Sequence, residues 1–316
     1  MTQAAMSAPR RSLGRRMWRG RWGYAFIALP AVLFAIFEFY PFVQAAIYSV
    51  SKWSLTGPVG FVGLSNFTTL LRDPIFWKAL VNTLLYAAVV VLGSIGFALV
   101  LATLIYPLAN RAKALFKMAF YLPAVASIVV VAMVWRWMYQ PAFGLLNFLL
   151  GLVGLGPLGF LTDSAEALPS IMVMQIFSNP TIGIGASLIL ILAAMNSIPH
   201  ELYEAAMIDG AGAIGRFRRI TVPLLRPTLV FLTIIGTVEA FREFTAIFLM
   251  TTTASSNTLT GGGPFYSTTT LAYYTYVQAF LTRQLGVAAA AAMVLFLLVL
   301  GLALLQFRRL NTEVEY

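Results

Sequence analysis

Long apolar segments separated by short polar ones follow one another along this chain of 316 residues. A helix needs about 20 apolar residues to cross a bilayer core of about 30 Å. Six segments reach that length, so the pattern predicts an all-α integral membrane protein with six transmembrane helices and no separate soluble domain. The expected spans are Tyr24–Ser49, Ala79–Tyr106, Met118–Tyr139, Leu168–Ala194, Leu224–Met250 and Leu285–Gln306.

A seventh apolar segment, Ala142–Phe160, has nearly the length of a span but contains many helix-breaking residues. Its glycines and Pro157 limit a continuous helix to about residues 142–150. A seventh span would also move the Arg-rich loop that follows to the other side of the membrane. We therefore expect a short external helix that lies against the membrane or the bundle.

The composition agrees with a membrane protein, because 60% of the residues are hydrophobic and only 10% are charged. A soluble domain would carry about 25% charged residues. The net charge of +10 does not indicate nucleic-acid binding, since most Lys and Arg residues lie in the two tails and in the loops after the second and fourth spans. Six spans place these four regions on one side, which the positive-inside rule assigns to the cytoplasm.

This topology divides the chain into three parts. We expect a basic cytoplasmic tail at residues 1–23, a transmembrane domain at 24–307 and a second cytoplasmic tail at 308–316. Both termini would then be cytoplasmic in a multi-pass protein of the cytoplasmic (inner) membrane, with the lipid bilayer as its surroundings.

Motifs for catalysis are absent from the sequence. It has no cysteine and a single histidine, His200, so no disulfide, thiolate chemistry or metal site is expected. It also lacks a GxxxxGK[ST] phosphate loop, an HExxH helix and a GxSxG elbow. We therefore expect no enzyme activity and no cofactor in this chain, and transport energy must come from an ion gradient or a separate ATPase.

The polar segment at residues 197–223, between the fourth and fifth spans, predicts a helix–turn–helix elbow on the cytoplasmic surface. Ser197 and Pro199 suit a helix start, and Gly210 suits the left-handed residue that follows a helix end. A second short helix is expected at about 213–221. The alternative interpretation is an ordinary amphipathic loop with snorkelling arginines.

The order of residues in this elbow closely resembles the EAA loop of permease subunits in binding-protein-dependent ABC importers. In that family the loop couples the permease to an ATPase, so the resemblance implies the type I importer permease fold and a coupling role for the matching residues. It also implies four partners besides the membrane: a second, similar permease, two ATPase subunits that bind ATP and Mg, and an external solute-binding protein. The matching residues are Glu204, Ala205, Ala206, Asp209, Gly210, Ala211, Phe217, Ile220 and Pro223.

Other segments resemble the carbohydrate-uptake branch of that family, which includes maltose-type and glycerol-phosphate-type permeases. A Thr/Ser-rich insertion before Gly261 departs from the family pattern and bears on contact with the binding protein. The matching segments are 61–67, 73–74, 76–77, 82–83, 262–264 and 268–270. The candidates for binding-protein contact are Asn257, Gly262, Gly263 and Pro264.

Polar residues of the fourth and fifth spans are candidates for a solute path, because such groups are costly inside a membrane. Those of the fifth span share a helix face, and two alternatives remain open: a buried Arg–Glu network, or the lining of a cavity for a polar solute. The resemblance favours the cavity, where hydrogen bonds and an aromatic face would suit a sugar. The candidates are Gln175, Ser178, Asn179, Thr181, Glu239, Phe241, Arg242 and Glu243.

The sequence therefore predicts one permease subunit of an ATP-driven ABC importer for a sugar, an oligosaccharide or a related polyol phosphate. The alternative function is an ion-coupled secondary transporter of a small polar solute, in which Glu239 and Arg242 would carry protons or ions. A companion ATPase with a Walker motif would distinguish the first function from the second.

Overall fold

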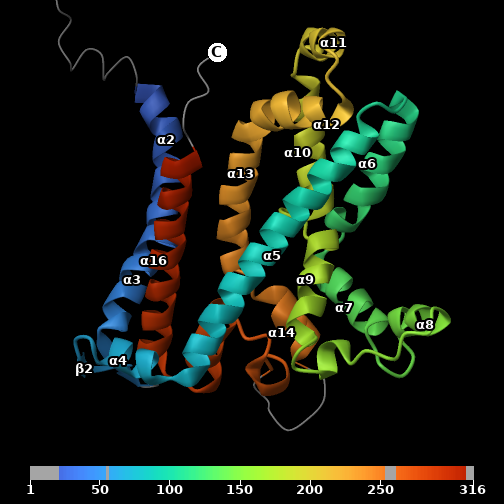
Figure 1. The fold of residues 1–316 in the computed structure, drawn as a ribbon. Coiled ribbons are helices and arrows are strands. Elements are labelled where there is room, and N and C mark those ends of the chain that lie inside the picture. Colours follow the sequence, from blue (N-terminus) through green and yellow to red (C-terminus); the bar gives the residue numbers. More distant parts are fainter. Residues whose placement is uncertain (1–20, 55–56, 253–260, 311–316) are drawn as a thin grey trace, which may run out of the picture.

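The computed structural model describes residues 21–54, 57–252 and 261–310, and these form a helical bundle with one small hairpin (Figure 1). Four of the described helices are long and apolar enough to cross a membrane, and up to six spans result if each bent helix pair counts as one. The chain is therefore a multi-pass membrane protein, as the apolar segments predict.

The first predicted span lies in an apolar helical stretch that contacts the rest of the chain mainly through its second half. It consists of α2 (Arg21–Phe34), η1 (Ala35–Phe39) and α3 (Tyr40–Ser49). Every residue from 26 to 43 is exposed. The stretch lies beside α16 (Leu285–Leu310), where the rings of Phe42 and Phe296 approach to 4.8 Å between centroids (Figure 1).

A hairpin and a short helix connect this stretch to the second span. The strands β1 (Ser51–Ser54) and β2 (Gly57–Phe61) pair antiparallel, and α4 (Ser65–Arg72) follows. The long helix α5 (Pro74–Ile105) then runs diagonally through the bundle (Figure 1). Its start is fixed by Asp73, whose carboxylate accepts a hydrogen bond from the Ile75 amide at 2.8 Å.

Each of the predicted third, fourth and fifth spans is interrupted, which the length of an apolar run does not reveal. The third consists of α6 (Asn110–Val125) and α7 (Ile128–Met138), which are bent by 98°. The fourth consists of α9 (Ala167–Ser178) and α10 (Ile184–Asn196), and the fifth of α13 (Val222–Phe241) and α14 (Thr245–Thr251). A second bend, of 72°, separates α10 from α11 (His200–Ile208).

Polar side chains stabilise the new helix starts at these interruptions. Ser127 accepts a hydrogen bond from the Val129 amide at the start of α7. Glu243 accepts one from the Ala246 amide at 2.7 Å at the start of α14. Each of these bonds satisfies one backbone donor at a new helix start, which lowers the cost of breaking the span.

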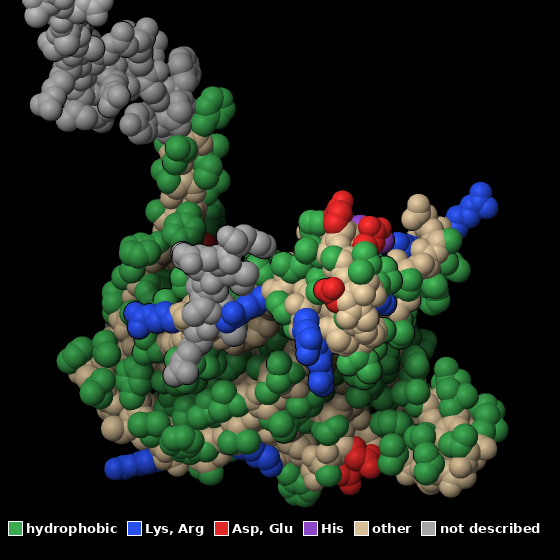
Figure 2. All heavy atoms as spheres, turned by 45° about the horizontal axis from the view of Figure 1, so that its top comes forward, with side chains coloured by type: hydrophobic (Ala, Val, Ile, Leu, Met, Phe, Trp, Pro, Cys, Tyr) green, Lys and Arg blue, Asp and Glu red, His purple; other side chains and the backbone are tan. Residues whose placement is uncertain are grey.

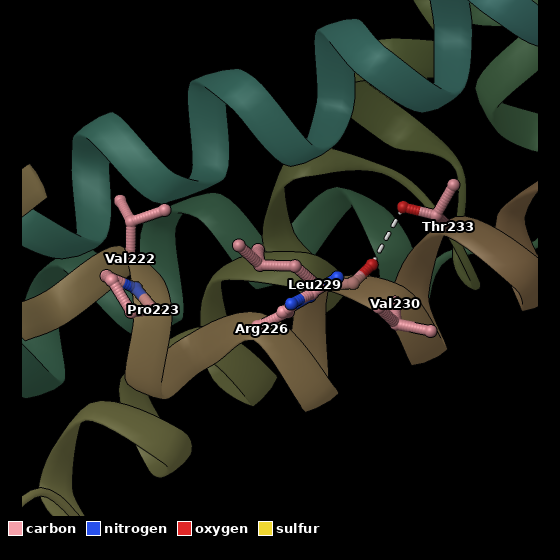
Figure 3. Close-up of a pocket in the computed structure, with 6 residues that line it drawn as sticks. All are labelled: Val222, Pro223, Arg226, Leu229, Val230 and Thr233. Carbon is pink, nitrogen blue, oxygen red and sulfur yellow. Dashed lines mark hydrogen bonds between the residues drawn. The ribbon is translucent and has the colours of Figure 1, made fainter. Parts of the chain in front are cut away.

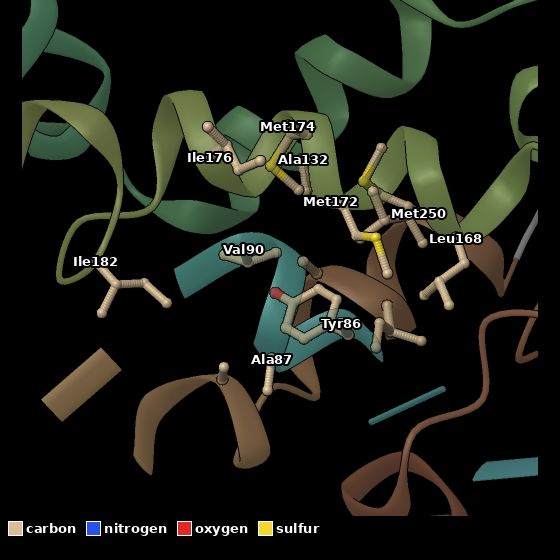
Figure 4. Close-up of a cluster of buried hydrophobic side chains, with 14 of the residues drawn as sticks. Tyr86, Ala87, Val90, Ala132, Leu168, Met172, Met174, Ile176, Ile182 and Met250 are labelled. Carbon is tan, nitrogen blue, oxygen red and sulfur yellow. The ribbon is translucent and has the colours of Figure 1, made fainter. Parts of the chain in front are cut away.

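The interrupted spans pack closely on one another and on α5. A methyl group on Gly185 of α10 would overlap the Phe120 carbonyl of α6. Gly236 of α13 lies against Val91 of α5 and against Ile182. Figure 4 shows Tyr86, Ala87 and Val90 of α5 facing the Met and Ile side chains of α9 in this core.

The remaining helices lie at the two ends of the bundle. The first end, which we call the elbow end, carries α11, α12 (Ala213–Arg216) and η3 (Phe217–Thr221), together with the start of α2 and the end of α16 (Figure 1). The second, the hairpin end, carries β1, β2, α4 and α14. It also holds four short elements: α8 (Leu145–Leu152), η2 (Phe160–Thr162), η4 (Pro264–Tyr266) and α15 (Leu271–Tyr276), the last continued by η5 (Val277–Leu281).

The helix α8 occupies the segment where a short external helix is expected. It starts three residues later than predicted, and none of its residues is buried. Asn147 holds the chain that follows it, because its side chain donates to the Leu158 carbonyl and accepts from the Leu158 amide, both at 2.9 Å.

Candidate functional site

The elbow forms where the sequence predicts it, as two short helices around a left-handed glycine. The helix α11 follows Pro199, and Gly210 has φ of +75° directly after the helix ends. The Ala211 amide donates to the Ala206 carbonyl at 2.8 Å, which closes the turn. The helix α12 and η3 then lead into α13 without a break.

Most of the elbow is open to its surroundings, and no residue of α11 is buried. Glu204 lies on the exposed side and approaches His200, with 3.1 Å between Oε1 and Nδ1. Figure 2 shows this histidine beside acidic side chains on a projecting surface. Among the predicted coupling residues, Ala206, Ala211, Phe217 and Ile220 are half-buried, and Glu204, Ala205, Asp209, Gly210 and Pro223 are exposed.

One face of the elbow joins it to the bundle. Tyr203 of α11 and Thr221 share a hydrogen bond between their hydroxyls at 3.0 Å. Tyr203 and Ile220 also pack against the buried cluster formed by α5, α10 and α13. These contacts attach α11 to the cluster of α5, α10 and α13.

The polar candidates of the fourth span are mostly buried in the break between α9 and α10. The Asn179 carboxamide oxygen accepts from the Thr181 and Ile182 amides at 2.8 and 3.0 Å, and its nitrogen donates to Gln175 at 3.1 Å. Ser178 accepts a hydrogen bond from the Trp135 indole at 3.1 Å. These groups hold the break together, and Thr181 is the exposed candidate of this set.

The fifth-span candidates do not share one face, because α13 ends at Phe241 and the chain turns. Phe241 is buried in the core of this chain taken by itself. Arg242 is exposed, and Glu239 and Glu243 are half-buried. No ion pair within residues 21–54, 57–252 and 261–310 joins Arg242 to either carboxylate, and the cavity lining stays a prediction.

Sequence reasoning missed Tyr86, which lies in the middle of an apolar run of α5. Its side chain is fully buried in the apolar core (Figure 4). Gln175 and Glu243 lie close enough to interact with it electrostatically. The Tyr86 hydroxyl and the Gln175 side-chain nitrogen have no hydrogen-bond partner among the described residues. A polar group in an apolar run was the available signal, and it points to a buried polar layer at the level of the breaks.

The loop before the sixth span is shaped by three consecutive glycines. Gly261, Gly262 and Gly263 have φ of +56°, +84° and +74°. Gly262 is buried, and Gly263 and Pro264 are half-buried, so these candidates for binding-protein contact mainly set the course of the backbone. Asn257, the fourth candidate, lies outside the described residues.

The helix α15, which follows this loop, is tied to the start of α5. The Tyr274 hydroxyl donates to the Asp73 carboxylate at 2.7 Å. Burial raises the pKa of the Tyr274 hydroxyl above its ordinary value, and its hydrogen bond to Asp73 acts in the same direction. The tyrosine therefore remains the donor, and the loop is held at both ends.

An open groove follows α13 from the elbow end (Figure 3). Its lining is largely apolar, and the Thr233 hydroxyl is already used by the Leu229 carbonyl at 2.7 Å. Such a lining offers few groups for a hydroxyl-rich solute. The lining residues are Val222, Pro223, Arg226, Leu229, Val230 and Thr233.

Metal-ligating side chains do not gather in the part of the chain that the structure describes. No group of three or more His, Asp or Glu side chains there could hold an ion.

Curated relatives match the chain over almost its full length. The "Probable ABC transporter permease protein YurN" of Bacillus subtilis is 33% identical over 92% of this chain and 97% of its own. The "sn-glycerol-3-phosphate transport system permease protein UgpA" of Pectobacterium atrosepticum is 32% identical, and the match covers 96% of this chain and 98% of that protein. No protein-family model matches the sequence.

Solved structures agree with these relatives. A crystal structure of a bacterial ABC transporter involved in the import of the acidic polysaccharide alginate contains a chain with a TM-score of 0.80 and 25% identity. That match covers 96% of this chain and 99% of the other. A crystal structure of the bacterial alginate ABC transporter in complex with alginate pentasaccharide-bound periplasmic protein contains a chain with a TM-score of 0.81. That match also covers 96% of this chain and 99% of the other.

The apolar helices and the exposed elbow define the class of the molecule, a membrane-embedded transport subunit. The chain belongs to the family of ABC transporter permeases. The comparisons support the importer function that the EAA-like elbow predicts, and they do not support the ion-coupled alternative.

Proposed function

We propose that this chain is a six-span subunit of an ABC importer for a sugar, an oligosaccharide or a polyol phosphate. The elbow end would lie in the cytoplasm with both termini, and the hairpin end would lie outside. The basic residues of the loops and tails support this orientation. Relatives named for sn-glycerol-3-phosphate and for alginate support the class of solute.

The observation that carries the proposal is the exposed elbow, attached to the bundle along one face only. Two ATPase subunits would bind ATP and Mg at the cytoplasmic side and receive α11 of this chain in a surface cleft. Their closure would move α11, and Tyr203 would transmit the movement through Thr221 to α13. Because α10 and α13 both contain or adjoin breaks in their spans, they can shift relative to α9 and α14.

A second, similar permease would complete the solute path. In this chain Thr181 and Arg242 are exposed at the breaks of the fourth and fifth spans. Charged and polar groups exposed at mid-membrane depth are costly in lipid, so a partner subunit or a water-filled path is the environment that suits them. Arg242 would attract an anionic solute, and Thr181 would offer a hydroxyl.

The test is the Glu204→Ala variant, measured in the complex of both permeases and the ATPase reconstituted in nanodiscs. A charge-assisted contact with the ATPase contributes about 1.5–3 kcal/mol. Its loss is expected to weaken retention of the ATPase by about tenfold or more and to lower stimulated ATP hydrolysis. Glu201→Ala is the matched control, because Glu201 is also exposed on α11 but one turn earlier.

The expected result is a large effect at Glu204 and a small one at Glu201, with equal yields of folded complex. If both variants hydrolyse ATP and take up solute like the unmodified complex, the elbow is not the element that couples the permease to the ATPase. Uptake driven by an ion gradient, with no ATPase present, would contradict the importer function itself.

A further inference from the structure

The loop at the hairpin end has an unusual backbone. Five of the six residues from 261 to 266 have positive φ angles, and two of them are not glycine: Phe265 at 51° and Tyr266 at 61°. A bulky residue in the left-handed region is rare, because its Cβ crowds the backbone. Such residues persist only where the surrounding structure fixes them, and they concentrate at functional positions.

Two side chains of α5 hold these residues in place. The Lys78 ammonium donates to the Phe265 carbonyl at 2.7 Å. The Asn82 carboxamide donates to the Tyr266 carbonyl at 3.3 Å and to the Thr269 carbonyl at 2.9 Å. Both left-handed residues therefore have their carbonyls fixed by a helix that lies far away in the sequence.

This arrangement does not bury Phe265 against the rest of the chain, because the residue is 82% exposed. Single exposed hydrophobic residues are common on proteins and need no explanation by themselves. An exposed ring on a strained backbone, which a lysine and an asparagine hold, is different. The hydrogen bonds fix the ring in an outward position and do not bury it.

We propose that Phe265 is the anchor that an external solute-binding protein receives in an apolar pocket when it docks on this permease. This inference rests on the proposed importer function. Its support for the choice of partner is the periplasmic protein bound to the structurally similar alginate transporter. Aromatic residues are enriched at the buried centres of interfaces, and a preformed loop loses little conformational entropy on binding.

The geometry also explains the three glycines. A side chain at Gly262 would meet the Thr269 hydroxyl, and one at Gly263 would crowd Thr268. The glycines let the chain turn tightly over the Thr-rich segment that follows, so that the next residues emerge at the surface. The candidates that the sequence offered, Gly262, Gly263 and Pro264, are thus the support for the contact, and Phe265 makes it.

The experiment uses the full complex in nanodiscs and its cognate solute-binding protein. Affinity for the binding protein is measured directly, and ATP hydrolysis is measured against the concentration of the binding protein. Phe265→Asn is the main variant, since asparagine tolerates the left-handed conformation but removes the ring. Phe61→Ala is the matched control, because Phe61 is 79% exposed at the same end but lies in an extended strand.

Loss of an interface anchor is expected to weaken binding by about tenfold or more. The concentration of binding protein that gives half-maximal ATP hydrolysis should rise by the same factor, whereas the maximal rate at saturation should remain unchanged. Phe265→Tyr should restore most of the affinity. Phe61→Ala should behave like the unmodified complex.

Other outcomes overturn the inference in distinguishable ways. If Phe265→Asn binds like the unmodified complex, the ring is not the anchor, and the importer function is unaffected. If the Phe265→Asn and Phe61→Ala variants weaken binding equally, the contact depends on general apolar surface and not on this loop. If Phe265→Asn changes only the incorporation into lipid, the ring is a membrane anchor. A binding protein that fails to stimulate even the unmodified complex would contradict the proposed function as well.

Discussion

The elbow at one end of the bundle is mostly exposed, whereas half of the residues in the loop at 261–270 at the other end are buried. No residue of α11 is buried, and a hydroxyl pair between Tyr203 and Thr221 links that helix to the bundle. In the loop, Gly262 and every residue from 267 to 270 are buried. Side chains from α5 and α14 hold that loop by hydrogen bonds to its backbone.

The difference fits the two kinds of contact that we propose. An element that follows the movement of an ATPase has to change position without disturbing the packed core, and an exposed helix attached along one face can do so. An element that receives a soluble partner benefits from a fixed shape, because less conformational freedom is then lost on binding. Substitutions of comparable chemistry should therefore have different consequences at the two ends.

The largest expected effect is that of Gly262→Val. Valine is strained at a φ of +84°, and its side chain would also overlap the Thr269 hydroxyl. The backbone strain and the side-chain overlap together should lower the free energy of unfolding by about 2–5 kcal/mol. We expect a lower melting temperature of the purified subunit complex and a lower yield of folded protein. An unchanged melting temperature would show that the loop is less constrained than its hydrogen bonds indicate.

Gly210→Val is the counterpart at the elbow, where φ is +75° but no atom lies within 4 Å of the added side chain. The strain of about 1–2 kcal/mol stays local to the turn. We expect a nearly unchanged melting temperature but a clear loss of stimulated ATP hydrolysis, because α11 is then presented at a wrong angle. A fall in melting temperature as large as that of Gly262→Val would remove the contrast between the two ends.

Asn82→Ala should produce a smaller effect that is specific to the external loop. The change removes the hydrogen-bond donor of two loop carbonyls and should lower the free energy of unfolding by about 1–3 kcal/mol. Asn66→Ala is the control, since Asn66 makes a similar pair of bonds, at 2.9 Å each, to the Ser49 and Ser51 carbonyls. Both variants should melt earlier, but only Asn82→Ala should raise the concentration of binding protein needed for half-maximal ATP hydrolysis.

The smallest effect is expected for His200→Ala. The side chains of His200 and Glu204 are 69% and 61% exposed, and an exposed pair of this kind contributes about 0.3–0.5 kcal/mol. We expect no measurable change in melting temperature and little change in ATP hydrolysis. A large loss of hydrolysis would mean that His200 positions Glu204 for its partner, and the elbow would then be more ordered than its exposure indicates.

Local patterns predicted the elements of this fold that depend on neighbouring residues. Apolar length predicted a multi-pass helical membrane protein, and Pro199 with Gly210 located the elbow. The breaks in three spans could not be predicted in the same way, because Glu243 stabilises the start of α14 only if the helix before it has ended. The helical spacing of Glu239, Arg242 and Glu243 was read across that end for the same reason, although α13 ends at Phe241.

The external loop shows a second limit of sequence reasoning. Its glycines predict a turn, but the exposure of Phe265 depends on Lys78 and Asn82, which lie 187 and 184 positions away from the carbonyls they bind. No local pattern connects residues at that separation. The EAA-like elbow was predictable because its residues lie within a single short segment.

The packing of the first helix against the last has a consequence for the biosynthesis of the protein. The stretch from α2 to α3 is synthesised before its packing partner α16, and about 235 residues separate the end of α3 from the start of α16 (Figure 1). The α3 surface that packs on α16 therefore stays uncovered by this partner while the residues between them are translated. A nascent chain that stops before Leu285 would leave that surface exposed in the membrane, where quality control could recognise it.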